Sequence, residues 1–178
     1  MGKYVRGISK CCIWGVDLLM ILVILGTQDK SFKRLLIAVQ EQIDNGNIKD
    51  KVVVQAGNTV FKSNEMEIYD LVPMDKFDEL IDKADIVITH AGVGSIITSL
   101  KKGKKIIAAP RLKKYKESEN DHQLEILNRL EESENIIALR DFSKLNEKLI
   151  EAKNFKPKPF KHNTPNMVKI IKNYIENS

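Results

Sequence analysis

From Met20 onward, apolar runs of strand length alternate with amphipathic stretches of helical length. Six runs predict strands, at Ile21–Leu25, Lys51–Gln55, Ile68–Val72, Asp85–Thr89, Lys105–Ala109 and Ile136–Leu139. Apolar positions recur at helical spacing before the second and fourth runs, at Phe32, Leu35, Leu36, Val39 and Ile43, and at Phe77, Leu80, Ile81 and Ala84. Continuous β-branched runs are typical of strands that are covered on both faces. The pattern therefore predicts an α/β fold, a doubly wound parallel sheet of Rossmann-like type over residues 20–152.

The N-terminal segment contains the apolar run Cys11–Leu25, which superficially resembles a membrane span. It is shorter than the ~20 apolar residues that a span needs, and Asp17 lies within it. A secretory leader is also a poor interpretation, because Gly26-Thr27-Gln28 offers no small-residue cleavage pattern. We interpret residues 1–19 as a non-essential extension upstream of the natural start.

The C-terminal segment carries most of the basic excess of the chain. Residues 153–163 read as a basic linker with two prolines, and residues 164–178 as an amphipathic helix. Thr164 suits the N-cap of this helix and Pro165 its first position. One stripe of the helix is apolar, so we expect it to pack either on this domain or on a partner.

Composition narrows the classes of function. The 178 residues are 43% hydrophobic, enough for one domain with a core, which excludes a disordered, collagenous or disulfide-stapled protein. The net charge of +5 comes without an arginine cluster or a basic stripe with aromatics, so no nucleic-acid partner is expected. The two cysteines are adjacent, which indicates a reducing, cytoplasmic setting. Neither they nor the three histidines have metal-ligand spacing.

Two strand-to-helix loops stand out as places for chemistry, Gly26–Ser31 and Thr89–Ser95. In doubly wound sheets ligands bind beyond the carboxyl ends of the strands. Glycines let a ligand approach the backbone closely, and free amides at a helix start favour a phosphate or diphosphate. The chain lacks three other common phosphate and nucleophile motifs. Ile97 occupies the place of the third glycine of a dinucleotide-binding fingerprint. Gly103 is not part of a P-loop, and Ser95 is not part of a nucleophile elbow.

Each candidate also has a purely structural interpretation. His90 could be a strand-end residue satisfied by backbone groups, and His122 a polar residue at a helix start beside Asp121. Gly26 could provide only a turn, and Thr27 only a helix cap. The lysines between positions 101 and 116 read as a solvated face, whereas Arg111, after a proline, could reach an anionic group.

Three blocks together resemble the C-terminal domain of family 28 glycosyltransferases. They are the run from Ala84 to Ser95, the run Gly103–Arg111 and the sequence Asn120-Asp121-His122-Gln123, which occur here with Gly26-Thr27-Gln28. The resemblance covers Met20 to Ser178 and is nearest to the small PssE-type subunits of bacterial capsule and exopolysaccharide synthesis. The eukaryotic dolichol-linked GlcNAc transferase has a similar cytosolic catalytic subunit.

The resemblance implies a single donor-binding lobe of GT-B type. The loop Gly92–Ser95 would hold the diphosphate of a UDP-sugar, Gln55, Ala56, Gly57, Leu71 and Val72 would line the base pocket, and His122 and Gln123 would touch sugar and phosphates. MurG-like members carry a glutamate for the ribose where this chain has Thr98. The implied donor-binding residues are Gly26, Thr27, Gln28, Gly57, Thr89, His90, Ala91, Gly92, Val93, Gly94, Ser95, Thr98, Arg111, Asp121, His122 and Gln123, with His90 as the catalytic candidate.

The resemblance also implies a partner, because a GT-B enzyme closes its donor lobe on an acceptor lobe. We expect a membrane-anchored acceptor-binding subunit of PssD type, which presents a polyprenyl-diphosphate-linked saccharide and recruits this subunit to the cytoplasmic face of the membrane. A hexose or uronic acid would move from the UDP-sugar to that lipid-linked acceptor without a metal or other cofactor. The general base could lie on the partner. A nucleotide-binding scaffold and a UDP-sugar epimerase are the alternatives.

Overall fold

The computed structural model describes residues 19–159, so the predicted C-terminal helix and all of the predicted N-terminal extension except Leu19 lie outside the described residues. One six-stranded sheet forms the centre, with the strand order β3-β2-β1-β4-β5-β6 and every neighbouring pair parallel. The strands are β1 (Met20–Ile24), β2 (Lys51–Gln55), β3 (Met66–Tyr69), β4 (Ile86–His90), β5 (Lys105–Ala109) and β6 (Ile137–Ala138). The predicted doubly wound parallel sheet is confirmed.

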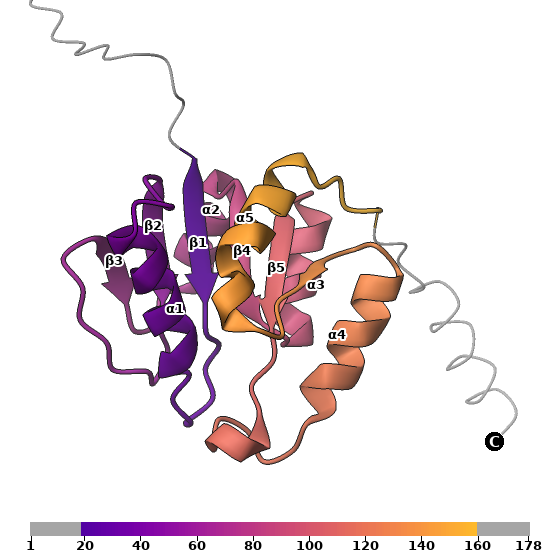
Figure 1. The fold of residues 1–178 in the computed structure, drawn as a ribbon, viewed down its shortest axis with the longest axis horizontal. Coiled ribbons are helices and arrows are strands. Elements are labelled where there is room, and N and C mark those ends of the chain that lie inside the picture. Colours follow the sequence, from indigo (N-terminus) through magenta and orange to yellow (C-terminus); the bar gives the residue numbers. More distant parts are fainter. Residues whose placement is uncertain (1–18, 160–178) are drawn as a thin grey trace, which may run out of the picture.

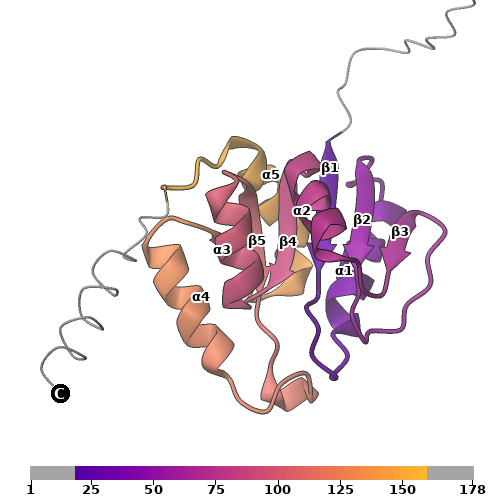
Figure 2. The same cartoon turned by 180° about the vertical axis from the view of Figure 1, so that it is seen from behind.

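Helices cover both faces of the sheet. Helices α1 (Lys33–Asp44) and α5 (Leu145–Asn154) lie over one face, as Figure 1 shows. Helices α2 (Met74–Lys83), α3 (Val93–Lys101) and α4 (His122–Glu132) lie over the other (Figure 2). Alternate strand residues divide between the two layers: Ile21 and Val23 pack with α1 and α5, whereas Leu22 packs with α2 and α3. Burial on both faces explains why these strands read as continuous apolar runs.

The strand order reverses between β1 and β4. From β1 the chain adds β2 and β3 on one side, then returns beside β1 with β4 and continues to β5 and β6. The carboxyl ends of β1 and β4 therefore meet at a topological switch point, where the flanking connections run in opposite directions and leave a crevice. The two loops singled out from the sequence both begin at this point.

Strands β1, β4 and β6 differ from the prediction by one residue at each end, and other boundaries differ by more. Helix α3 begins at Val93, inside the predicted loop Thr89–Ser95. The end of that loop, which contains Gly94, is therefore already the first helical turn. Strand β3 ends at Tyr69, three residues before the predicted end, although the amides of Ala56 and Gly57 still donate to the carbonyls of Tyr69 and Asp70.

The predicted basic linker also begins too early. Helix α5 runs through Asn154, and Phe155 packs against the core layer of α1 and α5. Lys158 is then held to the domain, because its amide donates to the carbonyl of Glu134 over 3.0 Å and its carbonyl accepts from Asn135 over 2.9 Å. The segment up to Lys158 is therefore part of the folded domain rather than a free connection.

Two glycines with positive φ provide a matched test of backbone packing. Gly57 has φ +58°, and a Cβ there would overlap the carbonyl oxygen of Gly26, whereas Gly103 has φ +67° and open space around its Cβ position. We expect Gly57→Ala to lower the free energy of unfolding by roughly 3 kcal/mol or more, through backbone strain plus overlap. Gly103→Ala carries the strain alone and should cost about 1 kcal/mol. Urea unfolding followed by circular dichroism measures both, and equal costs would refute close packing of the two loops.

Candidate functional site

A cleft of about 310 Å³ opens at the carboxyl edge of the sheet, at the switch point. Its apolar end comes from the connection between β3 and α2, and its polar end from the loops after β1 and β4. The residues that line it are Ile24, Gly26, Thr27, Gln55, Leu71, Val72, Met74, Phe77, His90, Gly92, Gly94 and Ser95. Such a cleft, with an apolar body and a few convergent polar groups, is the common form of a small-molecule site.

The imidazole of His90 lies between two glycines at the centre of this cleft. A Cβ on Gly92 would overlap its Nε2, and a Cβ on Gly26 would come within 2.6 Å of its Cε1. Its Nδ1 lies 3.4 Å from the carbonyl oxygen of Ile24. The imidazole ring leaves no room for a side chain at either position, so its packing requires glycine at both. The sequence pattern did not indicate this requirement.

Burial controls the charge of His90. Desolvation, followed by the nearby Arg111 charge, lowers its pKa from 6.5 to about 4, although the contact with the Ile24 carbonyl works in the opposite direction. The ring is neutral at physiological pH as a result. A contact in which Nδ1–H donates to the Ile24 carbonyl leaves Nε2, the atom that a Cβ on Gly92 would overlap, as an acceptor.

The start of helix α3 supplies backbone donors. Gly92 is its N-cap residue, and the first amides of a helix, here those of Val93, Gly94 and Ser95, have no acceptor within the helix. The first turn holds no acidic residue, and Gly94 has open space at its Cβ position. The positive end of the helix dipole and these amides favour an anion such as a phosphate.

Buried hydroxyl groups fix this turn in place. Thr89 is fully buried, and its Oγ1 donates to the carbonyl of Ile24 over 3.2 Å and lies 3.0 Å from Ser95 Oγ. Ser95 in turn donates to the carbonyl of Gly92 over 3.2 Å. Thr89 and Ser95 therefore link the end of β1 to the first turn of α3. Ala91, which lies between them in the sequence, is also buried.

The loop after β1 forms the other polar wall. Gly26 has φ +78°, which lets the chain turn sharply after the strand. Asn58 Nδ2 donates to the carbonyls of Thr27 (3.3 Å) and Gln28 (3.1 Å), which anchors the loop from the neighbouring connection. The N-cap residue of α1 is Phe32, whose amide donates to Thr59, so Thr27 is not a helix cap.

The apolar end contains residues that the sequence analysis missed. Met74 and Phe77 belong to the first turn of α2, and Met74 and Leu71 are 73% and 60% exposed. Phe77 was interpreted only as the beginning of a core stripe, and its position in the first helical turn next to a strand end was the available signal. Gln55, Leu71 and Val72 line this end, while Ala56 and Gly57 are buried and do not line the cleft.

Several of the predicted site residues do not line the cleft. Thr98 is one turn further into α3 and its hydroxyl donates back to the carbonyl of Gly94 over 3.0 Å. His122 is the first residue of α4 and is exposed, with Glu125 as its neighbour. Asp121 accepts a bond from the Lys113 amide over 2.9 Å, and Gln123 Oε1 accepts one from the Arg111 amide, also over 2.9 Å.

Arg111 corrects the expectation that its side chain reaches an anionic group. Only 1% of its surface is exposed, because the guanidinium donates to the carbonyls of Leu25, Lys30 and Glu117 instead. Its remaining nitrogen, Nε, is buried without a partner among the described residues. The Arg111 side chain is therefore not placed to contact a ligand in the cleft.

Residues 19–159 contain neither a cluster of metal-ligating side chains nor a membrane-spanning helix. Within that part of the chain no three His, Cys, Asp or Glu side chains gather in a way that could hold a metal ion. Over the same residues no helix is both long and apolar enough to span a membrane.

Comparison with known proteins is informative at the level of the domain. A family model described as the glycosyltransferase family 28 C-terminal domain matches residues 20–177. A search of curated protein sequences gives no significant match. The match begins at the same residue as β1 and includes every element of the sheet.

Solved structures share the fold at low sequence identity. ALG13 is 20% identical over 84% of this chain and 93% of its own length, with a TM-score of 0.55. MurG of Acinetobacter baumannii is 16% identical, with 79% of this chain and 43% of that one covered and a TM-score of 0.56. The glycotransferase of kitacinnamycin is 17% identical, with 86% and 40% covered and a TM-score of 0.56.

The chain thus spans less than half the length of MurG and of the kitacinnamycin enzyme, but nearly all of ALG13. These likenesses confirm the predicted Rossmann-like lobe of GT-B type. By the family model, the chain belongs to the family of the glycosyltransferase 28 C-terminal domain.

Proposed function

We propose that this protein is the donor-binding catalytic subunit of a two-component glycosyltransferase that uses a UDP-sugar. One observation carries the proposal: the cleft at the switch point joins an apolar pocket to a helix start with free amides. A nucleoside diphosphate has the same two parts in the same order, a flat base and a diphosphate. Membership in the family supports the transfer of a sugar as the reaction.

The order of the strands suggests how the donor lies. Along the carboxyl edge, Leu71 and Val72 follow β3, Gln55 ends β2, and the loops with Gly26 and Gly92 follow β1 and β4. The base would lie against the connections after β3 and β2, and the diphosphate on the amides of α3. The sugar then extends past β4 toward β5 and the start of α4, where Gln123 is held.

In the proposed reaction the bond between the sugar C1 and the diphosphate oxygen breaks, and a bond from C1 to an acceptor hydroxyl oxygen forms. UDP leaves with the bonding electron pair, and the acceptor proton passes to a base. The α3 amides and helix dipole would stabilise the charge that develops on the diphosphate, so the proposal includes no metal. Neutral His90, with Nε2 as an acceptor, would orient a donor or acceptor hydroxyl group, and the general base would lie on the partner.

The acceptor site would come from a second subunit. We place the acceptor, a lipid-linked saccharide, on a membrane-anchored subunit of PssD type that recruits this chain to the cytoplasmic face, in capsule or exopolysaccharide synthesis. The exposed apolar side chains of Leu71 and Met74, which line the cleft, support a covering lobe, because isolated exposed residues are common but exposed apolar residues grouped at a site are more typical of an interface.

The test is sugar transfer by the full chain, with a panel of radiolabelled UDP-sugars and a membrane fraction that contains the partner. We expect transfer to lipid only when both components are present, with undiminished rate in EDTA. Gly46→Ala, a remote glycine with open space around it, should retain full activity. Epimerisation of a UDP-sugar by the chain alone would support the epimerase alternative. UDP binding without transfer in the presence of the partner would support a scaffold.

A further inference from the structure

Arg111 connects two loops that flank the end of β4. It follows β5, yet its Nη2 donates to the carbonyl of Leu25 at the end of β1 over 2.7 Å, and its Nη1 to the carbonyl of Lys30 over 2.6 Å. Strand β4 lies between β1 and β5 in the sheet. The guanidinium therefore reaches from one neighbour of β4 to the other, and its charge acts on His90 at the end of β4.

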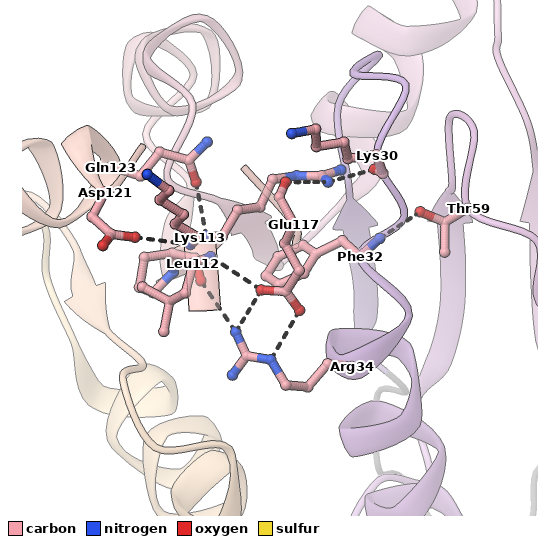
Figure 3. A network of polar contacts seen from close by, with 11 residues as sticks. Lys30, Phe32, Arg34, Thr59, Leu112, Lys113, Glu117, Asp121 and Gln123 are labelled. Carbon is pink, nitrogen blue, oxygen red and sulfur yellow. Dashed lines mark hydrogen bonds and ion pairs between the residues drawn. The ribbon is translucent and has the colours of Figure 1, made fainter. Parts of the chain in front are cut away.

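An ion pair between Arg34 and Glu117 holds the connection between β5 and α4 against α1. Glu117, 4% exposed, accepts from Arg34 Nε over 3.0 Å, from Arg34 Nη2 over 2.8 Å and from the Leu112 amide over 3.1 Å. The Arg34 guanidinium lies 4.0 Å from the ring centre of Phe142 and 4.3 Å from that of Tyr115. Figure 3 shows Arg34 and Glu117 facing each other between these two parts of the chain.

The same connection sets the start of α4. The Arg111 amide donates to Gln123 Oε1 over 2.9 Å. The Lys113 amide donates to Asp121 Oδ1, also over 2.9 Å (Figure 3). Because its oxygen is already bonded, the amide nitrogen of Gln123 is the part of the side chain that remains to donate to a ligand. The position of Gln123 thus depends on Arg111, and the connection that carries Arg111 depends on Glu117 and Arg34.

Buried ion pairs contribute little to stability on balance, because the cost of removing the charges from water offsets their attraction. Their geometry is nevertheless strict, since a bidentate pair of arginine and carboxylate allows one mutual orientation. Here that orientation fixes the start of α1 to the connection after β5, and the bonds from Arg111 to the carbonyls of Leu25 and Lys30 fix the loop after β1 to the same connection. A ligand that contacts both of these segments would find them already held in their relative positions.

We propose that Arg34, Glu117 and Arg111 are positioning residues for the sugar part of the donor, an inference that rests on the proposed UDP-sugar site. They hold the Gly26–Lys30 loop and the start of α4 at the separation that a sugar beyond the diphosphate requires. The nucleoside end of the cleft, formed by the connections after β2 and β3, does not depend on them. Binding of the sugar and binding of UDP should therefore respond differently to changes in this network.

The experiment compares UDP with UDP-sugars on the full chain by isothermal titration, after the wild type has identified which sugar of a panel binds best. The variants are Glu117→Gln, Arg34→Met and the double variant. We expect each variant to bind UDP within about twofold of the wild-type affinity. The affinity for the preferred UDP-sugar should fall about tenfold or more, because the Gly26–Lys30 loop and the start of α4 are no longer held in place. Because the two residues act as one pair, the double variant should be no worse than the more affected single one.

Arg140→Gln is the matched control, since Arg140 also pairs with a glutamate, Glu131, but lies after β6, away from the cleft. It should leave both affinities unchanged. Circular dichroism and hydrogen exchange over residues 112–121 check the fold, and we expect faster exchange in that segment alone. If Glu117→Gln does not fold, Arg34→Met, altered at a partly exposed side chain, decides the question.

Three results would count against the inference in distinguishable ways. Equal losses of UDP and UDP-sugar affinity would make the network a general support of the fold. Unchanged UDP-sugar affinity in both single variants would separate it from the site. Absence of UDP binding in the wild type would overturn the proposed function itself, and with it the inference.

Discussion

Gly94→Val is expected to abolish UDP binding while the protein stays folded. Gly94 lies in the first turn of α3 and lines the cleft, and its Cβ direction meets open space. Its φ is not in the left-handed region, so valine fits the backbone and improves on the helix propensity of glycine. The added side chain would occupy the place where a phosphate approaches the free amides, and we expect the affinity to fall by roughly a hundredfold or more.

Isothermal titration with UDP measures this loss, and urea unfolding measures the stability in parallel. Ile97→Val is the control on the same helix, because Ile97 does not line the cleft, and its affinity should match that of the wild type. Undiminished UDP affinity in Gly94→Val would remove the start of α3 from the site. A large loss of stability in the same variant would show that the open space at Gly94 is not free in solution.

The second large effect concerns pH and His90. In the folded protein burial lowers the pKa of His90 to about 4, compared with 6.5 for a solvated histidine. Between these values the unfolded chain binds a proton that the folded chain does not, so stability is complete above pH 6.5 and falls as the pH drops toward 4. The difference of about 2.5 pKa units corresponds to about 3 kcal/mol over this range.

We expect His90→Gln to remove this part of the pH dependence. Thermal or urea unfolding at a series of pH values from 7 to 4 should show the wild type losing about 3 kcal/mol more than the variant. The exposed His122 offers a matched control for the replacement of an imidazole by an amide, as His122→Gln. Parallel profiles of the wild type and His90→Gln would mean that the imidazole is solvated rather than enclosed by Gly26 and Gly92.

The sequence predicted the sheet well because its strands carry a strong signal. Lys51–Gln55 and Lys105–Ala109 were predicted with the correct bounds, since the apolar run of the first lies between Lys51 and Gln55 and that of the second between Lys105 and Pro110. The ends of β3 were less predictable. That strand is at the edge of the sheet, and its extent depends on the pairing of Val52–Gln55 with Met66–Tyr69, which is a tertiary property.

For the site, the sequence predicted the two loops but not how their side chains are used. Glycines near a helix start are visible in a sequence, whereas the packing of Gly26 and Gly92 around His90 is visible only in three dimensions. Arg111 illustrates the limit. A basic residue after a proline suggested an anion, but its partners are backbone carbonyls, and two of the three belong to Leu25 and Lys30, more than 80 positions away, which no local pattern encodes.

The central claim, that the switch-point cleft binds a UDP-sugar through the amides of α3, is tested most directly by amide chemical shifts. A titration of the isotope-labelled full chain with UDP should shift the amides of residues 92–95, 26–28 and 71–72, and leave those around Arg140 and Lys148 unchanged. Shifts confined to the neighbourhood of Arg140 and Lys148, or no shifts at millimolar UDP, would contradict it.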